Sequence, residues 1–481
     1  PVVTFNYIPF ARSDHDCFLV SWSPPSSIPR NVRGLWRCNV DILQEAAFLT
    51  EFKIRFERWR TLKPAFSSLR LWWDHIKSRT SSLIRKYSRQ RAAKNSEDLF
   101  LLNQRLAELN GVLNSGSQSS AVLEQYYETK EKIAAHQRRI NREALVRSRV
   151  KHLNEGEKCT RFFLQAERKR GKQKIIDGVK NCNGVLLTDQ QDILNEYKNF
   201  YENMFTAEPI NKASTDELLS HVCRSLSPEQ AGFLDSPLKR GEFREALLQM
   251  ENNKCPGADG LPKEFYVAVW DVVGDDLCDV LFEGLEEGSL SSSQNLSIIS
   301  LLQKSGDPLD PQNKRPISLL NLDYKILSKV LTNRLKTVMD TLVHPDQTCS
   351  VPGRSIHNNL VLFRDVVTYV NENNLPCAIV SLDQRKAFDR VNFTYLHAVL
   401  ERMGFGPIFR SFISTCYKGA CCSVIVNGQL SDRFYPSRGV RQGCSLSPLL
   451  YVLSLEPFAQ MVRDNVAIKG LRLPGGEESK L

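Results

Sequence analysis

The sequence predicts an α+β fold. Beyond about residue 236, short apolar runs of strand length alternate with segments of helical periodicity, which is the pattern of a mixed sheet packed with helices. Before that, apolar residues recur at helical spacing from about Asp41 to His152, and two strand-like runs open the chain. With 481 residues, 42% of them hydrophobic, the chain has room for about three domains with real cores.

The first 152 residues divide at a proline-rich stretch. Residues 1–22 predict two short strands around a polar turn, and residues 23–29, with three prolines, cannot continue a helix or a sheet interior. The helical region that follows is interrupted by the polar run Asn110–Ser120, where we expect a loop. One apolar stripe at helical spacing is typical of simple packing: Leu99, Leu102, Leu106 and Leu109.

Residues 153–235 have a different character. We expect strands at Lys174–Ile176 and Val185–Leu187, with a turn at Asp177-Gly178, and a helix near Asp192–Phe205. A further helix over Phe243–Met250 leads into a loop rich in Pro and Gly at 254–262.

A basic balance suits a polyanionic partner. The net charge is +10, and thirteen Lys and Arg against four Glu lie between His136 and Lys174. Most such runs are solvated helix faces. Aromatic residues inside this run favour a phosphate-binding surface, for which we select Arg168, Lys169 and Arg170.

Cysteine usage and hydropathy exclude several classes of protein. The thirteen cysteines include no CxxC pair, so the sequence predicts a reduced, intracellular protein with neither a disulfide framework nor a zinc site. No apolar stretch approaches about eighteen residues and no signal peptide is visible, which argues against a membrane protein. Because the chain opens on Pro1, we expect an internal piece of a longer polypeptide.

An acidic side chain follows an apolar run near residue 380. Ala378–Val380 predicts a short buried strand that delivers Asp383 at its C-terminal end. Phosphoryl transfer to a hydroxyl uses carboxylates placed in this way to hold two divalent cations, so Asp383 is a candidate catalytic metal ligand. The alternative is a helix N-cap after a strand.

About sixty residues later, the segment Arg438–Pro448 (RGVRQGCSLSP) places a Gly-rich turn before a helix. In this order the two segments resemble motifs A and B of reverse transcriptases from non-long-terminal-repeat (LINE-type) retrotransposons. Further ordered matches to the same family are Pro256–Gly260 with Glu264–Tyr266, Ile298–Asp307 with Asn313–Asn321, Tyr324–Leu335, and Asp346-Gln347 with Pro352–Ile356.

The resemblance implies roles for single residues. Phe388 would lie beneath the incoming sugar and exclude a 2′-hydroxyl, although alone it reads as a core aromatic. Gln442 and Gly443 would contact the incoming nucleotide, with a loop glycine at a helix start as the alternative. Asp389 should already lie in a helix and turn away from the metal site, which favours a structural salt bridge.

Cations of the predicted fingers hairpin would bind phosphate. Of Lys304, Lys314 and Arg315, we select Arg315, because its planar fork of donors suits phosphate, while any of them could be a surface cation. The implied cofactor is Mg²⁺ or Mn²⁺. The implied partners are an RNA template, a DNA primer or target, and deoxynucleoside triphosphates, with no membrane, in the cytoplasm and nucleus.

A second site is implied near the start. Ser13-Asp14-His15 resembles the closing signature of the apurinic/apyrimidinic-type endonuclease that precedes the polymerase in this family, so Asp14 and His15 would be remnants of its active site. The resemblance divides the chain into the endonuclease end at 1–22, a helical linker at 23–152, an N-terminal extension of the reverse transcriptase at 153–235, and right-hand polymerase fingers with a partial palm at 236–481.

The family's motif C, an aromatic-Ala-Asp-Asp hairpin that supplies two more metal-binding carboxylates, does not occur in these residues. We therefore expect a fragment of an RNA-directed DNA polymerase that is inactive alone. The alternatives are an RNA-binding fragment without catalysis and a related intron-encoded or telomerase-like polymerase; Ser13–His15 argues against the latter.

Overall fold

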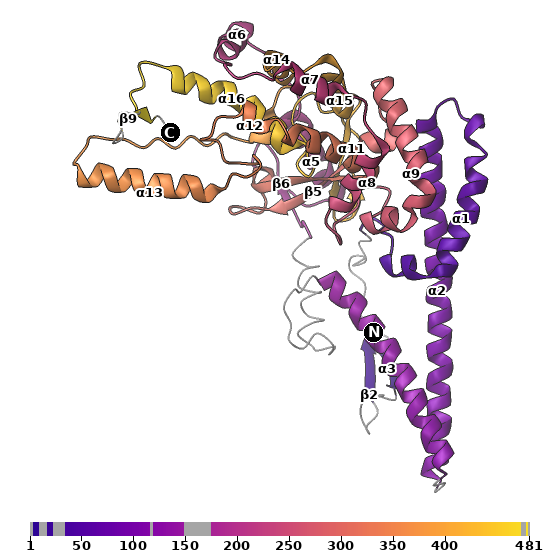
Figure 1. The fold of residues 1–481 in the computed structure, drawn as a ribbon. Coiled ribbons are helices and arrows are strands. Elements are labelled where there is room, and N and C mark those ends of the chain that lie inside the picture. Colours follow the sequence, from indigo (N-terminus) through magenta and orange to yellow (C-terminus); the bar gives the residue numbers. More distant parts are fainter. Residues whose placement is uncertain are drawn as a thin grey trace. The chain divides into compact units, whose positions relative to one another are not determined.

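The computed structural model describes residues 3–8, 17–22, 34–115, 119–148, 175–472 and 478–479 (Figure 1). The chain forms two compact units, which are described separately. Unit 1 contains Pro1–Gly34 and Leu83–Asp177, and unit 2 contains Leu35–Ser82 and Gly178–Leu481.

Unit 1 is a strand pair with two helical segments. Strands β1 (Val3–Ile8) and β2 (Cys17–Trp22) are antiparallel, in a register that pairs Val3 with Trp22, which confirms the two strands predicted there. Helix α2 (Leu69–Asn114) contributes its residues from Leu83 on, and α3 is Ser120–Ser148. The loop predicted over Asn110–Ser120 is wrong for Asn110–Asn114, because these residues belong to α2. Side chains of both helices are buried, among them Leu106, Leu109 and Ile133.

The first α-helix of unit 2 buries a row of aromatic side chains. In α1 (Ala46–Arg60), Phe48, Phe52 and Phe56 recur every four residues, so they share one face, and all three are buried. Phe52 packs edge-to-face on Phe265 of α9 (Lys263–Glu286), with 5.5 Å between ring centroids. The start of the helical region therefore belongs to the same core as residues far along the chain.

The central sheet of unit 2 has the strand order β6-β5-β7-β8. Strands β5 (Leu296–Gln303) and β6 (Lys314–Leu320) form the predicted antiparallel hairpin, in register from Ser297–Leu320 to Gln303–Lys314. Strand β7 (Cys421–Val426) runs parallel to β5 on its other side, and β8 is Gln429–Leu430. The mixture of sheet and helices confirms the predicted α+β class.

Helices surround this sheet. Helices α5 (Gln190–Met204) and α8 (Arg240–Gln249) confirm the helices predicted at these positions. The other helical elements of unit 2 are η1 (Val40–Gln44), η2 (Lys63–Ala65), α6 (Lys212–Ser220), α7 (Pro228–Asp235), α10 (Ser292–Asn295), η3 (Pro311–Asn313), α11 (Leu322–Lys336), α12 (Met339–Leu342), α13 (Ile356–Glu372), η4 (Ala387–Arg390), α14 (Phe393–Arg402), α15 (Pro407–Tyr417) and α16 (Ser447–Asp464). The short strands β9 (Leu471–Arg472) and β10 (Glu478–Ser479) pair with each other.

The strand predicted at Lys174–Ile176 is wrong. Its described residues, Ile175 and Ile176, are not in a strand, and the pair forms later, between β3 (Val179–Lys180) and β4 (Leu186–Leu187). The reason is the side chain of Asn181, whose Oδ1 accepts hydrogen bonds from the amides of Asn183 and Val185 at 3.0 and 2.9 Å. This local turn fixes where the two strands meet.

The predicted buried strand Ala378–Val380 is also wrong. Residues 375–384 have no regular secondary structure, and Ile379 and Val380 are 59% and 76% exposed. A strand needs a neighbour for its backbone groups, and no strand in the described part of the chain pairs with this segment. The sequence pattern alone is therefore insufficient to form a strand here.

We expect the backbone amides of Ala378–Leu382 to exchange with solvent within the first time points, because they make no sheet hydrogen bonds. The amides of Ile298 and Ile299 in β5, which pair on both sides, serve as the internal control and should be protected. Hydrogen exchange followed by mass spectrometry measures both segments in one experiment. Strong protection across Ala378–Leu382 would contradict the structure.

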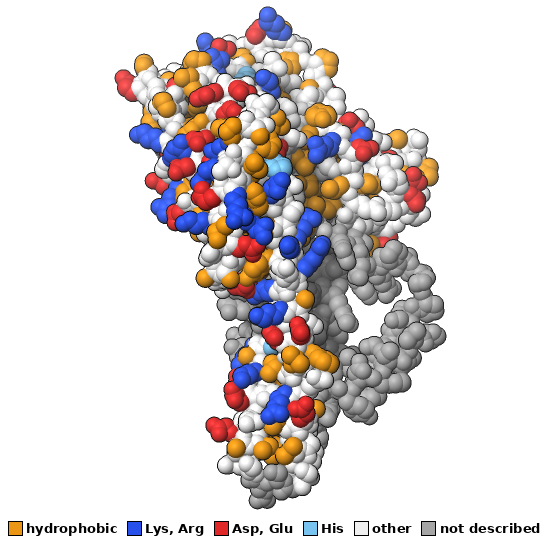
Figure 2. All heavy atoms as spheres, turned by 90° about the vertical axis from the view of Figure 1, so that its right-hand side faces the viewer, with side chains coloured by type: hydrophobic (Ala, Val, Ile, Leu, Met, Phe, Trp, Pro, Cys, Tyr) orange, Lys and Arg blue, Asp and Glu red, His pale blue; other side chains and the backbone are white. Residues whose placement is uncertain are grey.

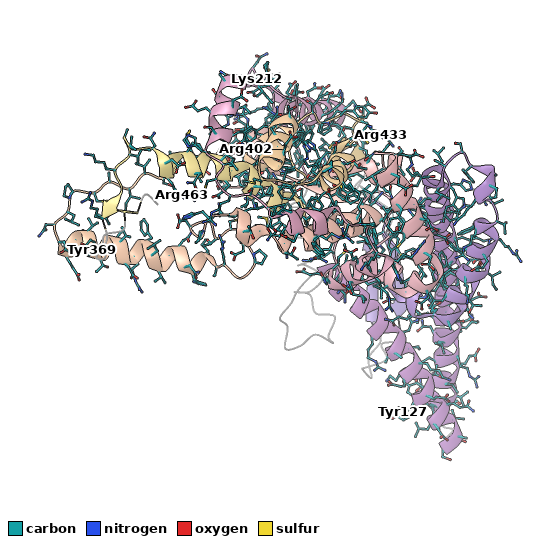
Figure 3. All side chains as sticks on the ribbon, turned by 45° about the horizontal axis from the view of Figure 1, so that its top comes forward. Tyr127, Lys212, Tyr369, Arg402, Arg433 and Arg463 are labelled. Atoms are coloured by element: carbon teal, nitrogen blue, oxygen red, sulfur yellow. The ribbon has the colours of Figure 1, made fainter. Side chains whose placement is uncertain are left out.

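Helix α13, directly before this segment, buries none of its residues. Its side chains, Tyr369 among them, project from the ribbon (Figure 3).

On the face drawn in Figure 2, Lys and Arg side chains interleave with Asp and Glu and do not form a patch of one sign. Among the described residues, no helix combines the length and apolar character needed to cross a membrane.

Candidate active site

Asp383 lies in the irregular segment before η4, and its side chain is exposed. Helix α16 lies nearby, since the hydroxyl of Tyr451 on this helix donates to the side chain of Gln384, the residue after Asp383. Partial burial, Cys349 and the negative charge of Asp383 raise the pKa of Tyr451. No cluster of three His, Cys, Asp or Glu side chains that could hold a metal ion occurs among the residues described.

Asp383 is suited to supply one of the ligands of a magnesium site. Mg²⁺ prefers oxygen ligands and is often bound by one or two carboxylates together with substrate phosphates and water. An exposed carboxylate is available for such a role, whereas a cage made wholly of protein ligands is not present in the described part of the chain.

Phe388 is half-buried at η4 and stacks on a second aromatic ring. Its centroid lies 4.8 Å from that of Tyr451 on α16, with an angle of 19° between the ring planes. The Tyr451 hydroxyl donates a hydrogen bond of 2.7 Å to Oε1 of Gln384, beside Asp383. The ring is therefore fixed in place next to the predicted metal ligand.

Asp389, the next residue, is buried and faces another predicted site residue. Its Oδ1 accepts a hydrogen bond of 2.8 Å from Nε2 of Gln442. Asp389 as a whole is 2% exposed. Burial raises the pKa of Asp389 to about 6, against the effects of the Gln442 hydrogen bond and of Lys386 and Lys304. The predicted helical position is confirmed in the short helix η4, but the predicted salt bridge is wrong: among the described side chains, its partner is an amide.

The backbone also joins these two segments. The amide of Val440 donates to the carbonyl of Phe388 at 2.8 Å, and the amide of Gly439 donates to that of Val391 at 2.7 Å. The two segments are far apart in the sequence, and these backbone hydrogen bonds bring them side by side in the structure.

The turn at Gln442-Gly443 is pressed against the hairpin. The amide of Ser318 in β6 donates to the carbonyl of Gln442 at 2.7 Å. Gly443 has φ +118°, and a Cβ at this position would lie 2.7 Å from the carbonyl oxygen of Ser318. Only glycine fits, because both the backbone conformation and the close approach exclude a side chain.

Arg441 is a residue that sequence reasoning missed. It is buried, its guanidinium lies 4.6 Å from the ring centroid of Tyr324 on α11, and its Nη2 donates to the carbonyl of Asn295 at 3.3 Å. It anchors the turn to α10 and α11. An arginine beside Gln442 gives no signal in the sequence that separates such an anchor from a surface cation.

The hairpin cations differ in their surroundings. Arg315 is exposed on β6, as is Lys304 at the end of β5. Lys314 is buried, its Nζ donates to Oε1 of Gln303, and burial lowers its pKa. Arg315 and Lys304 are thus available to a ligand, whereas Lys314 stabilises the hairpin.

A cavity of about 540 Å³ opens beside η4. Its lining comes from α5, from η3, from η4 with the segment before it, and from the start of the 438–443 segment. It includes Phe200, Gln312, Arg385, Lys386, Arg390 and Arg438. Glu208 neutralises part of this charge, because its Oε1 lies 3.0 Å from Arg438 Nη1 and 3.3 Å from Arg390 Nη2.

Two further cations of this cavity are held by a neutral residue, one by its side chain and one by its backbone. Arg385 donates to Oε1 of Gln312 at 2.9 Å, and Lys386 donates to the carbonyl of Gln312 at 3.1 Å. Lys386 has the left-handed conformation, with φ +54°, which is strained for a lysine. Burial and the charge of Lys304 lower its pKa, so an anion here would relieve a local excess of positive charge.

Five of the predicted site residues lie outside the described residues: Asp14, His15, Arg168, Lys169 and Arg170. Their roles stay predictions. The structure brings Phe388, Gln442 and Gly443 together around η4, and Arg315 lies on the strand that carries Ser318, against which the turn packs.

Comparison with known proteins gives consistent matches. Residues 302–472 match the family model described as reverse transcriptase (RNA-dependent DNA polymerase). The transposon TX1 uncharacterized 149 kDa protein of Xenopus laevis is 36% identical over 471 residues, which cover 98% of this chain and 36% of that protein.

More distant similarity extends to insect elements. The Pol polyprotein from the type-2 retrotransposable element R2DM of Drosophila melanogaster is 27% identical over 234 residues, which cover 49% of this chain and 22% of that protein. A probable RNA-directed DNA polymerase from transposon X-element of the same fly is 26% identical over 232 residues, covering 45% of this chain and 24% of its own length. The chain thus spans about a third or less of the length of these relatives.

Proposed function

We propose that this chain takes part in RNA-directed DNA synthesis, since it is a member of the reverse transcriptases of non-long-terminal-repeat (LINE-type) retrotransposons. The longer protein would extend a nicked DNA 3′-end along an RNA template. The observation that supports this best is the meeting of η4 with the Gly439–Gly443 turn, because it brings Phe388, Gln442 and Gly443 close to one another.

Within this proposal the elements have specific parts. The β5–β6 hairpin and α11 would be the fingers, and η4, α14 and α16 would belong to the palm. Asp383 would hold Mg²⁺ together with the substrate phosphates, and that ion would lower the barrier to attack by the primer hydroxyl when bound. The endonuclease remnant at 1–22, the extension at 153–235 and the RNA-binding run around residues 168–170 are proposals that rest on the resemblance and the charge pattern.

The cavity beside η4 offers a place for negative charge. Arg385 and Lys386 line it and are bonded to the neutral Gln312, so phosphates of an incoming nucleotide would gain two charge-assisted hydrogen bonds there. Phe388 and Gln442 lie on the adjoining segments, which suits a nucleotide whose sugar and phosphates bind side by side.

The test of the function is primer extension by a polypeptide extended to the length of its relatives. DNA synthesis on an RNA template, dependent on Mg²⁺ and on deoxynucleoside triphosphates, is the expected result. Binding of RNA without any extension of the primer would favour the alternative of a non-catalytic RNA-binding protein.

Replacing Phe388 by alanine should keep DNA synthesis while admitting ribonucleotides, because the ring that would block a 2′-hydroxyl is removed. Primer extension with each nucleotide type measures the ratio of the two rates. The matched control is Tyr451→Phe, which keeps the stacked ring and loses only the hydrogen bond to Gln384. Unchanged discrimination in Phe388→Ala would assign the ring to the core.

A further inference from the structure

The hydrogen bond between Asp389 and Gln442 has a fixed direction while Asp389 is ionised: Gln442 donates and Asp389 accepts. An ionised carboxylate has only acceptors, whereas a glutamine amide carries donors on Nε2 and an acceptor on Oε1. With Nε2 at 2.8 Å from Asp389 Oδ1, the amide must turn its Oε1 away from the carboxylate. The orientation of Gln442 is therefore dictated by the charge on its neighbour.

The rest of Gln442 is held by other contacts. Its carbonyl accepts from Ser318, and the next residue has the conformation that only glycine adopts easily. These contacts fix the backbone but leave the side-chain amide free to rotate by 180°. In the described structure, Asp389 is the residue that distinguishes the two orientations of the amide.

We propose that Asp389 is a positioning residue, which orients the amide of Gln442 so that its carbonyl oxygen accepts a hydrogen bond from a hydroxyl or amino group of the nucleotide. This rests on the nucleotide contact proposed above for Gln442. Asp389 itself touches no substrate in this account. Its burial at the floor of a small cavity shared with Gln442, Gly439 and Ser318 keeps water from replacing it as the acceptor.

The charge of Asp389 makes this orientation sensitive to pH. Lys386 and Lys304 face it as cations, and the hydroxyl of Tyr201 on α5 lies close enough for its pKa to be affected by Asp389. Tyr417, Cys422 and Arg441 line the same cavity. With the pKa of Asp389 raised to about 6, the carboxylate is ionised at neutral pH and protonated at pH 5. A protonated carboxyl can donate, so either amide orientation then becomes acceptable.

The first experiment observes the amide directly, without nucleotide. The 481-residue chain is labelled with ¹⁵N-glutamine, and the side-chain resonance of Gln442 is identified by its loss in Gln442→Ala. We expect this resonance to shift between pH 8 and pH 5 with a midpoint near 6 in the wild type, and to show no such titration in Asp389→Asn. Identical behaviour of the two proteins at every pH would overturn the proposal.

The second experiment measures binding of thymidine triphosphate. Asp389→Leu offers no acceptor to the Gln442 amide, so it should weaken binding about tenfold, the equivalent of one hydrogen bond between Gln442 and the nucleotide. Asp389→Asn keeps an acceptor and should recover affinity to within about threefold. Wild-type affinity in Asp389→Leu would overturn the positioning role.

Controls separate positioning from simple loss of stability. Glu242→Gln removes a charge from the buried Arg334 ion pair, at 2.7 Å, elsewhere in unit 2, so it should lower the melting temperature and leave nucleotide affinity unchanged. Absence of nucleotide binding by the wild type would count against the proposed function, and the amide resonance would still decide on Asp389.

Discussion

Replacing Lys77 by methionine should lower the free energy of unfolding of unit 2 by about 3–5 kcal/mol, because it leaves buried carboxylates without their cation. Lys77 lies on the first part of α2 and is 4% exposed. Its Nζ is 2.6 Å from Oδ2 of Asp323, which is fully buried at the start of α11, and 3.5 Å from Oδ2 of Asp259.

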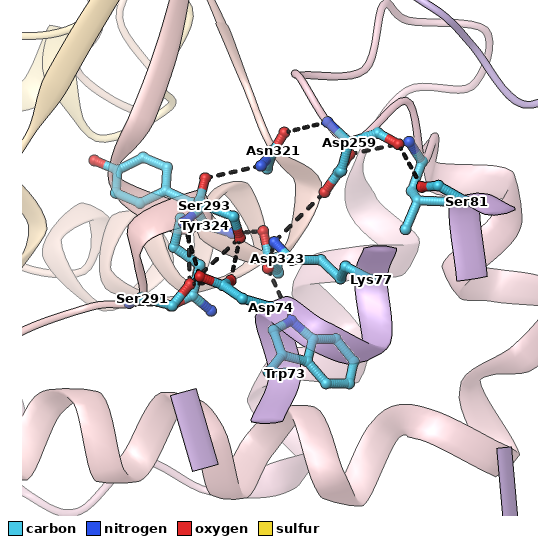
Figure 4. A network of polar contacts seen from close by, with 12 residues as sticks. Trp73, Asp74, Lys77, Ser81, Asp259, Ser291, Ser293, Asn321, Asp323 and Tyr324 are labelled. Atoms are coloured by element: carbon cyan, nitrogen blue, oxygen red, sulfur yellow. Dashed lines mark hydrogen bonds and ion pairs between the residues drawn. The ribbon is translucent and has the colours of Figure 1, made fainter. Parts of the chain in front are cut away.

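Further polar side chains form hydrogen bonds to this ion group (Figure 4). The indole of Trp73 donates to Asp323 at 2.9 Å, and the hydroxyl of Ser81 donates to the carbonyl of Asp259 at 3.0 Å. Asn321 accepts from the amide of Asp259 at 3.2 Å and donates to the carbonyl of Ser293 at 2.8 Å. The network ties α2 to the loop at 257–261 and to α11.

The balance of charge in this network sets its response to pH. Burial lowers the pKa of Lys77, but the charges of Asp323, Asp259 and Asp74 outweigh it and raise the pKa overall. Burial raises the pKa of Asp259 to about 6, so the folded protein binds this proton more tightly than the unfolded chain does. The contribution of Asp259 to stability therefore grows as the pH falls from about 6 toward 4. In Lys77→Met, with no cation nearby, this gain on acidification should be larger.

Unfolding in urea, followed by the fluorescence of the buried Trp72 and Trp73, measures both effects. Lys198→Met is the matched control, because it removes a more exposed pair with Glu202 at 3.3 Å on α5 and should cost less than about 1 kcal/mol. The triple variant Lys77→Met with Asp259→Asn and Asp323→Asn should recover much of the loss, since it buries no charge. A loss below about 1 kcal/mol in Lys77→Met would show that the network is not closed to water.

This network also bears on the organisation of the chain. Residues 35–82 share ion pairs, hydrogen bonds and an aromatic core with residues beyond 259, whereas the sequence placed them in a linker at 23–152. We propose that they belong to the polymerase part of the protein. The periodicity is helical on both sides of residue 82, so it carries no signal that separates residues 35–82 from those that follow.

The predictions from sequence succeeded where the determinants are local. The resemblance of two neighbouring segments to the family located the β5–β6 hairpin, and helical periodicity located α5 and α8. The ordered motifs led to the family without any knowledge of contacts. The residues that make up each of these elements lie within about twenty positions of one another, so a pattern in the sequence can reveal them.

The interactions that define the site are long-range. Gln442 and Asp389 are 53 residues apart, and Lys77 and Asp323 are 246 apart. Neither pair can be predicted from a period or a motif, because the sequence does not show whether the partner of a carboxylate is a cation or an amide. The same limit explains Ala378–Val380, where the pattern predicted a strand but pairing depends on another segment.

Exposure of Asp383 has a direct consequence for experiment. Because its side chain lies on an unpaired segment, replacing it removes a carboxylate without opening a cavity or breaking a buried contact. The variant Asp383→Ala should therefore fold as the wild type does, and any loss of activity reports on chemistry and not on stability.

Replacing Asp383 by alanine, in a polypeptide extended to the length of its relatives, should reduce Mg²⁺-dependent DNA synthesis to background while template binding is kept. Two-metal phosphoryl transfer needs carboxylates to hold the two cations close together, and a water molecule that takes the vacated position supplies no negative charge. Primer extension and binding of an RNA–DNA hybrid measure the two properties. Asp365→Ala on α13 is the matched control, because it removes an exposed carboxylate paired with Arg364 in the same unit and should leave synthesis unchanged. Robust synthesis by Asp383→Ala would place the metal site on other carboxylates.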